Sequence, residues 1–135
     1  MAKILIVEDE MFVRELYERV LSQNGFEVFT ASDGEKGLAI AASAHPDLIL
    51  LDVMMPGVNG LEVLKRLKAD SDLKDIPVVL LTNLGQQSVI QQALDQGASG
   101  YLMKVRLTPY QVLAHVKEFL QNPGLKLEPN PANFD

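Results

Sequence analysis

Polar side chains capable of chemistry follow four short apolar runs of the sequence, each at the point where the run ends. They are Glu8, Asp9 and Glu10 after the run 4–7, Asp52 after 48–51, Thr82 after 78–81 and Lys104 after 101–103. Carboxylates that lie close together repel one another unless a cation joins them. Oxygen ligands without histidine or cysteine beside them favour Mg²⁺ or a similar ion. If the runs end together, these residue types predict a cation site with a hydroxyl and an amine beside it.

Each of these residues also has a purely structural interpretation. Asp9 and Glu10 would suit the start of a following helix, because carboxylates interact favourably with the helix dipole. Asp52 would cap a turn, Thr82 would simply end a strand, and Lys104 would be a solvated surface lysine. The occurrence of all of them directly after apolar runs favours the functional interpretation.

The elements that position these residues follow from hydrophobic periodicity. The runs at 4–7, 28–31, 48–51, 78–81 and 101–103 are short, and three of them lack polar alternation, as in strands buried on both faces of a parallel sheet. Between the runs, apolar residues recur at helical spacing over 13–21, 38–42, 61–67, 90–94 and 112–120. This alternation predicts an α/β fold, (βα)5, with helices on both faces of the sheet.

Capping residues bound the predicted helices. Ser32-Asp33 precedes the second helix, and Thr108-Pro109 supplies a cap and a first helical residue for the fifth. Gly25 and Gly97 follow the first and fourth helices as stops. In an open parallel sheet, ligands bind at the carboxyl ends of the strands beside the topological switch point, so the polar residues are expected to meet there.

Composition excludes several classes of protein. The 135 residues suit one domain, and the absence of cysteine excludes disulfides and thiolate metal sites. A net charge of −6 argues against direct nucleic-acid binding, and no apolar run approaches the roughly 20 residues that span a bilayer. We expect a cytoplasmic protein with a domain at 1–121. The three prolines of 122–135 indicate a Pro-rich tail or truncated linker.

Two other kinds of site have little support in the sequence. Glu8-Asp9-Glu10 stands after the first run where a phosphate-cradling site would have a glycine-rich turn, which argues against direct nucleotide or flavin binding. His45 and His115 fall in or beside predicted helices, away from the strand ends, which argues against a histidine-based zinc or catalytic site.

Over about 1–121 the sequence resembles the receiver domain of two-component response regulators. The resemblance is carried by ILIVEDE at 4–10, PDLILLDVMMPGVNGLEVL at 46–64, PVVLLT at 77–82 and GASGYLMK at 97–104. It implies a flavodoxin-like, doubly wound five-stranded sheet in the order 2-1-3-4-5. It also implies a bacterial signalling module that catalyses its own phosphotransfer and autodephosphorylation but is not a metabolic enzyme.

The resemblance assigns roles to the acidic residues. Asp52 would be the phosphoacceptor, taking a phosphoryl group from a phosphohistidine to form an aspartyl phosphate. Asp9, Asp52 and the backbone carbonyl of Met54 would ligate Mg²⁺, with Glu8 acting through water. Mg²⁺ typically keeps several waters and binds one or two carboxylates plus substrate phosphate, which suits a half-open site of this kind.

The resemblance also implies a switch and partners. Lys104 would pair with a phosphoryl oxygen, Thr82 would donate its hydroxyl to another, and Tyr101 would follow Thr82 inward as a rotameric switch. The spacing of Tyr101 fits a half-buried strand aromatic equally well. The partners would be a sensor histidine kinase or phosphotransfer protein, and an effector or second copy binding the face of the fourth helix, fifth strand and fifth helix.

Two positions depart from the family pattern. Val105 stands where the family usually has a proline, so we expect a slightly longer loop with trans peptides, because a cis bond without proline costs about 3 kcal/mol. Asn83 replaces the usual small residue and would narrow access to Asp52. Pro56 and Gly60 would shape the loop after Asp52.

Three other functions remain to be distinguished. A degenerate receiver would serve as an interaction module independent of phosphorylation and would show no Mg²⁺-dependent labelling. An aspartyl phosphatase or mutase typically has a second acid two residues after its nucleophile, whereas Asp52-Val53-Met54 has none. A flavin-binding electron carrier would be coloured when purified.

Overall fold

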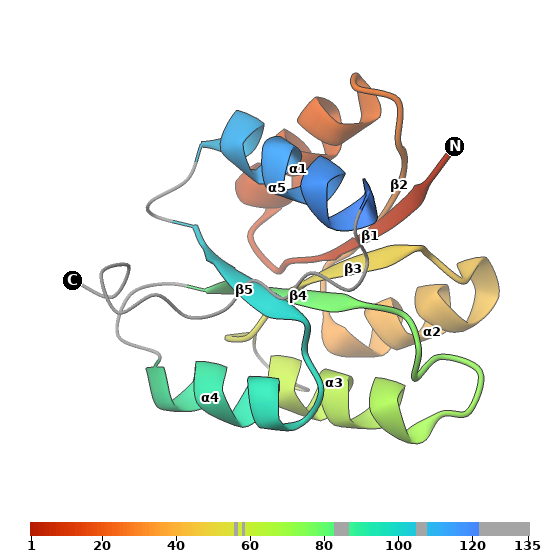
Figure 1. The fold of residues 1–135 in the computed structure, drawn as a ribbon, viewed down its shortest axis with the longest axis vertical. Helices are drawn as coiled ribbons and strands as arrows, with labels where there is room; N and C mark the ends of the chain where they lie inside the picture. The colour runs from red at the N-terminus through yellow and green to blue at the C-terminus, as the bar shows by residue number, and fades with distance from the viewer. Residues whose placement is uncertain (56, 58, 83–86, 105–107, 122–135) are drawn as a thin grey trace.

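The computed structural model describes residues 1–55, 57, 59–82, 87–104 and 108–121. In these ranges five strands alternate with five helices (Figure 1). The strands are β1 (Lys3–Val7), β2 (Glu27–Ala31), β3 (Leu48–Asp52), β4 (Val78–Thr82) and β5 (Gly100–Met103). The helices are α1 (Met11–Ser22), α2 (Gly34–Ala44), α3 (Gly60–Ala69), α4 (Gln87–Asp95) and α5 (Pro109–Gln121). Each predicted strand and helix is confirmed, with strand ends within one residue of the expected ones.

The strands form one parallel sheet in the order β2-β1-β3-β4-β5, as the family resemblance implied. α1 and α5 cover one face of the sheet, and α2, α3 and α4 cover the other (Figure 1). Because successive side chains of a strand point to opposite faces, each central strand contributes to both cores. In β1, Ile4 and Ile6 pack under α1 and α5, whereas Leu5 and Val7 pack on the opposite side.

Burial along the strands follows their place in the sheet. β3, β4 and β5 are buried at every residue, and β1 at every residue but its first, as expected for strands that are apolar apart from Lys3 at the start of β1 and Asp52 and Thr82 at the ends of β3 and β4. β2 lies at the edge and is buried only at Ala31. The two apolar cores pack against both faces of the sheet, and the carboxyl ends of its parallel strands lie together at one edge.

The predicted caps form the expected contacts. The Asp33 carboxylate accepts a hydrogen bond from the Lys36 N–H at 2.9 Å at the start of α2. At the start of α5, the Thr108 hydroxyl accepts from the Gln111 N–H at 3.2 Å, and the Gln111 side chain accepts from the Thr108 N–H at 2.7 Å. This reciprocal pair is a capping box that fixes where α5 begins. Gly97, after α4, has a φ of +107°, which an L side chain rarely adopts.

Several expectations concern residues outside the described ranges. They are those for Pro56, Asn83, Val105 and the segment 122–135. Among the described residues, no helix combines the length and the apolar character that crossing a membrane requires.

Candidate functional site

The topological switch point of this sheet lies between β1 and β3. From β1 the chain passes to the edge strand β2 and then returns to β3 on the other side of β1. The two strands pair in register, with Val7 opposite Leu51, so Glu8 and Asp9 leave the sheet beside Asp52. Connections on the two sides of such a point diverge and leave a crevice at the carboxyl ends, which is where ligands bind in open α/β sheets.

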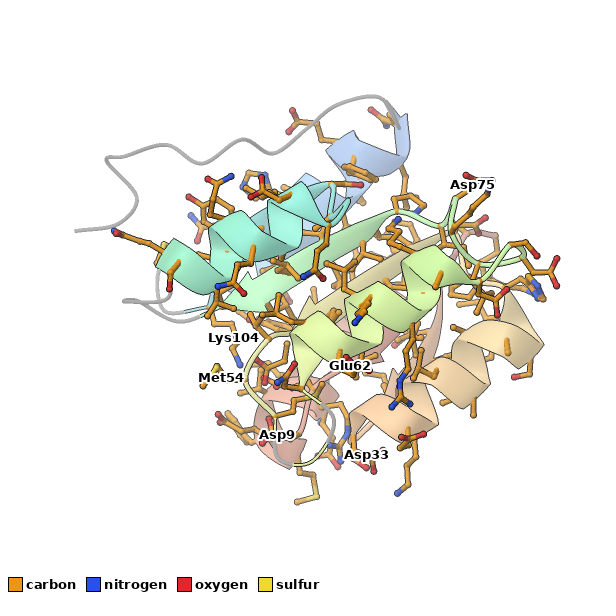
Figure 2. The ribbon with its side chains drawn as sticks, turned by 90° about the horizontal axis from the view of Figure 1, so that it is seen from below. Asp9, Asp33, Met54, Glu62, Asp75 and Lys104 are labelled. Carbon is orange, nitrogen blue, oxygen red and sulfur yellow. The ribbon has the colours of Figure 1, made fainter. Side chains whose placement is uncertain are left out.

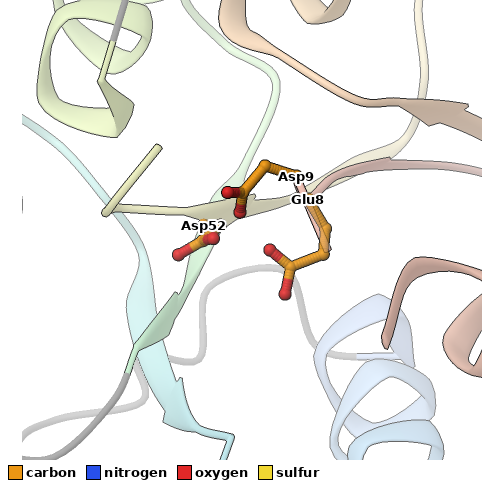
Figure 3. A group of neighbouring side chains, drawn as sticks. All are labelled: Glu8, Asp9 and Asp52. Atoms are coloured by element: carbon orange, nitrogen blue, oxygen red, sulfur yellow. The ribbon is translucent and has the colours of Figure 1, made fainter. Parts of the chain in front are cut away.

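Three carboxyl groups meet at this point. Glu8, Asp9 and Asp52 each offer an oxygen atom within 4.8 Å of the others, and Figure 3 shows the side chains converging from the ends of β1 and β3. Glu8 is fully buried, Asp52 is 3% exposed and Asp9 is half-buried. The buried Oε2 atom of Glu8 has no hydrogen-bond partner among the described residues. An unsatisfied buried oxygen among three carboxyl groups fits the ligand chemistry of a hard divalent cation.

Lys104 brings a positive charge to the acidic cluster. Its Nζ lies 2.7 Å from Oε1 of Glu8 and 3.4 Å from Oδ2 of Asp52, and its side chain is only 9% exposed. The Lys104 backbone N–H donates to the Thr82 carbonyl at 2.8 Å, which continues the pairing of β4 and β5 by one residue and so aims the side chain across β4. Figure 2 shows Asp9, Met54 and Lys104 at one end of the molecule and Asp75 at the other.

The crowding of like charges changes the acidity of the site. Burial, together with the neighbouring Glu8 and Asp9 carboxyl groups, raises the pKa of Asp52 to about 8, although Lys104 acts in the opposite direction. Burial alone would lower the pKa of Lys104, but its contacts with Glu8 and Asp52 outweigh burial and raise it. The site therefore favours the charged form of Lys104 and disfavours ionisation of Asp52 unless another cation joins it.

Thr82 and Tyr101 lie on the same face of the sheet. Thr82 continues the alternation of Val78 and Leu80, which face α2, α3 and α4, and Tyr101 faces the same side. The register places Tyr101 opposite Leu80, diagonal to Thr82. Both residues are buried, with Tyr101 5% exposed. The Thr82 hydroxyl has no hydrogen-bond partner among the described residues.

The segment after Asp52 is held close to the strand. The Met54 N–H donates to Oδ1 of Asp52 at 3.2 Å, so Asp52 does cap the turn that follows β3. Its other oxygen, Oδ2, lies 3.4 Å from Nζ of Lys104, a contact that capping does not require. Gly60 opens α3 against the end of β3, and a Cβ atom there would lie 2.5 Å from the Asp52 carbonyl oxygen. Only glycine permits this approach, in agreement with the expected role of Gly60.

The structure also shows where Glu10 and the two histidines lie. Glu10 is the N-cap of α1, but its side chain makes no capping hydrogen bond. His45 ends α2 in the left-handed conformation, and His115 lies within α5, so both belong to helices as expected.

Sequence reasoning missed Arg14, a half-buried residue of α1. Its guanidinium donates a hydrogen bond to the backbone carbonyl of Glu8 at 2.9 Å. The available signal was its position, because a basic residue near the start of a helix opposes the helix dipole.

A parallel sheet in the order β2-β1-β3-β4-β5, with five helices on its two faces, is the architecture of a flavodoxin-like (βα)5 domain, and the acidic cluster lies at its switch point. Residues 4–117 match the family described as the response regulator receiver domain. The chain belongs to this family.

Solved structures and curated proteins show the same relationship. The chemotaxis protein CheY4 of Vibrio cholerae superposes with a TM-score of 0.81 at 35% identity, covering 87% of this chain and 98% of that one. RpaA of Synechocystis, a DNA-binding transcriptional regulator, is 42% identical over 90% of this chain and 50% of its own length. The phosphate regulon regulator PhoB of Escherichia coli is 37% identical over 94% of this chain and 60% of its own length. The chain therefore spans about half to three fifths of these two regulators.

Proposed function

We propose that this domain is a phosphoacceptor, which takes a phosphoryl group from a phosphohistidine onto Asp52 and changes the α4-β5-α5 face in response. The observation that carries the proposal is the placement of Asp52: a buried carboxyl group at the end of a central strand, with an ammonium group 3.4 Å away and two further carboxyl groups beside it. A carboxyl group in a purely structural position would not need such neighbours.

The proposed reaction transfers a phosphoryl group from a histidine nitrogen to a carboxylate oxygen of Asp52. A carboxylate oxygen of Asp52 forms a bond to phosphorus while the bond from phosphorus to the histidine nitrogen breaks, and the nitrogen keeps the electron pair. The carboxyl group must be ionised to attack. Its raised pKa therefore calls for a cation, and Lys104 already favours the ionised form.

We propose Asp9, Asp52 and the backbone carbonyl of Met54 as ligands of Mg²⁺, with Glu8 acting through water. When bound, Mg²⁺ would neutralise negative charge on the carboxyl groups and on the incoming phosphoryl oxygens. The Oε2 atom of Glu8, which has no hydrogen-bond partner in the part of the chain that the structure describes, supports a role on the cation side, since the other oxygen of Glu8 is paired with Lys104.

The remaining residues would respond to the phosphoryl group. We propose that Lys104 pairs with one phosphoryl oxygen, that the Thr82 hydroxyl, unpartnered among the described residues, donates to another, and that Tyr101 senses the movement of Thr82 on their shared face of the sheet. Since α4 packs on that face, the changes would reach the α4-β5-α5 face, where an effector or a second copy would bind.

Partners and context are part of the proposal. The phosphodonor would be a sensor histidine kinase or a phosphotransfer protein in the cytoplasm. Residues 1–121 would form the receiver domain, and 122–135 would be a tail or part of a linker. PhoB and RpaA are longer transcriptional regulators, which supports an effector domain as the output, whereas this acidic domain would not itself bind nucleic acid.

Asp52→Asn is expected to abolish phosphorylation. Wild-type protein incubated with acetyl phosphate and Mg²⁺ should gain about 80 Da, the mass of one phosphoryl group, and intact-mass spectrometry would follow the gain. The control Asp72→Asn changes an exposed acid in the same way and should label like wild type. Undiminished labelling of Asp52→Asn would overturn the assignment, and absence of labelling in wild type would favour a phosphorylation-independent interaction module.

Thr82→Ala is expected to uncouple the α4-β5-α5 face from the acidic cluster. A charge-assisted hydrogen bond contributes about 1.5–3 kcal/mol, enough to move a two-state equilibrium by roughly 10- to 100-fold. With beryllofluoride as phosphoryl mimic, amide resonances of α4 and β5 should shift in wild type and in Thr82→Ser, but not in Thr82→Ala. If the wild-type shifts stay confined to residues around Asp52, the proposed coupling is wrong.

A further inference from the structure

Arg14 contacts the segment that carries the acidic pair through the backbone. Its Nη1 atom donates to the Glu8 carbonyl at 2.9 Å and lies 3.5 Å from the Asp9 carbonyl. In the preceding peptide group, the Glu8 N–H donates to the Ala31 carbonyl at 3.0 Å. The backbone of Glu8 is therefore held at both its donor and its acceptor, by β2 and by Arg14.

The position of Arg14 is unfavourable for a helix considered alone. It is the fourth residue of α1, and a cation in the first turns of a helix interacts unfavourably with the positive end of the helix dipole. Arg19, the other basic residue of α1, lies in the last turn, where the dipole favours it. The first turn of α1 contains no acidic residue, and its N-cap Glu10 makes no side-chain hydrogen bond. The contact of Arg14 with the β1-α1 segment therefore explains why a basic residue occupies this position of the helix.

We propose that Arg14 is a positioning residue, which fixes the backbone from which the Glu8 and Asp9 carboxyl groups project. A guanidinium is planar, always charged and able to donate to two acceptors at once, which suits two successive carbonyls. Lys104 holds the Glu8 side chain from across the sheet, while Arg14 holds its main chain from α1. Together they preorganise the acidic pair before any cation binds.

The inference rests on the proposed function, because a preorganised acidic pair matters for a Mg²⁺-dependent phosphoacceptor. Groups that orient metal ligands without touching the metal typically change affinity by about 10- to 100-fold when removed. Arg14→Gln should therefore raise the Mg²⁺ concentration at half-maximal effect by about tenfold, while the labelling rate at saturating Mg²⁺ stays close to wild type. Arg14 does not touch the reacting atoms, so the effect should fall on cation binding.

The experiment compares Arg14→Gln with Arg19→Gln, which removes the same charge from the same helix in its last turn. In metal-free protein, amide resonances of Glu8 and Asp9 should move in Arg14→Gln and stay in place in Arg19→Gln. Thermal melts over a Mg²⁺ titration, and initial labelling rates with acetyl phosphate over the same titration, then give the half-maximal Mg²⁺ concentration. Arg14→Lys keeps the charge with a single donor group and should fall between wild type and Arg14→Gln.

Two results would overturn the role of Arg14. One is a Mg²⁺ titration in which Arg14→Gln matches Arg19→Gln, and the other is an unmoved pair of Glu8 and Asp9 amides in the metal-free variant. If wild type itself ignores Mg²⁺, the cation part of the proposed function fails, and the metal-free amide resonances still decide whether Arg14 holds the segment. Should Arg14→Gln not fold, Arg14→Lys provides the same comparison.

Discussion

Lys104→Met is expected to lower the free energy of unfolding of the metal-free protein by about 3 kcal/mol at neutral pH. The Lys104 ammonium is nearly buried and contacts the fully buried Glu8 at 2.7 Å. Methionine fills a similar volume but leaves that carboxyl group without its cation, beside two further carboxyl groups. Removing one partner of a buried pair is costly because the other stays out of water without compensation.

Urea denaturation in EDTA would measure the loss. Lys65→Met, an exposed position on α3, is the matched control and should change stability by less than about 0.5 kcal/mol. Glu8→Gln introduced into Lys104→Met should restore much of the loss, because the uncompensated group is gone, and it keeps the comparison possible if the single variant is too unstable. Mg²⁺ should stabilise Lys104→Met more than wild type. A loss no larger than that of Lys65→Met would contradict the assigned pairing.

The second large effect is a pH-dependent stabilisation of the metal-free protein by Asp52→Asn. The pKa of Asp52 is raised from 3.8 to about 8 in the folded chain. Between these two values, the unfolded chain has released this proton and the folded chain has kept it. Folded wild type thus binds more protons than unfolded wild type, and its stability falls as pH rises from about 4 to about 8. The slope from this one group reaches at most about 1.4 kcal/mol per pH unit.

The amide side chain of the Asp52→Asn variant does not titrate, so the variant lacks this contribution. The difference in unfolding free energy between Asp52→Asn and wild type should be small at pH 4 and should grow in favour of the variant toward pH 8, measured in EDTA. Excess Mg²⁺ should narrow this difference: wild type would gain about 2.7 kcal/mol at a hundredfold excess over Kd, and the variant much less, because it lacks a ligand. Asp9→Asn should show the same loss of the Mg²⁺ response. If Asp52→Asn is less stable than wild type at pH 8 in EDTA, Asp52 acts as a structural cap, and the inference that its pKa is raised in the folded chain is contradicted.

The strand ends could be predicted from the sequence because an apolar run and the polar residue that follows it are both local features. An apolar run such as 48–51 predicts a buried strand, and the next residue, Asp52, must leave it at the carboxyl end. The general geometry of parallel sheets then brings residues from different strands to one edge. Glu8, Asp9, Asp52 and Lys104 lie together for this reason. The order of the strands came from the family resemblance, since hydrophobic periodicity does not determine which strands are neighbours.

The pairing of side chains within the site could not be predicted. Whether Lys104 contacts Glu8, Asp9 or Asp52 depends on the register of β4 and β5 and on side-chain length, and here the longer Glu8 side chain makes the closer contact. The contact of Arg14 with a carbonyl oxygen involves the backbone, which every residue possesses, so its acceptor leaves no pattern in the sequence.

The ion pair between Glu8 and Lys104 joins positions 96 residues apart in the chain. During synthesis, the three acidic residues of the cluster therefore leave the ribosome well before Lys104, which directly follows β5. Until β5 adds to the edge of the sheet, the burial of Glu8 lacks its counter-charge, so the first four strands on their own form an electrostatically incomplete intermediate. Docking of the last strand then adds β5 at the edge of the sheet and brings the counter-charge to the acidic cluster in one event, which would link the electrostatic balance of the cluster to completion of the fold.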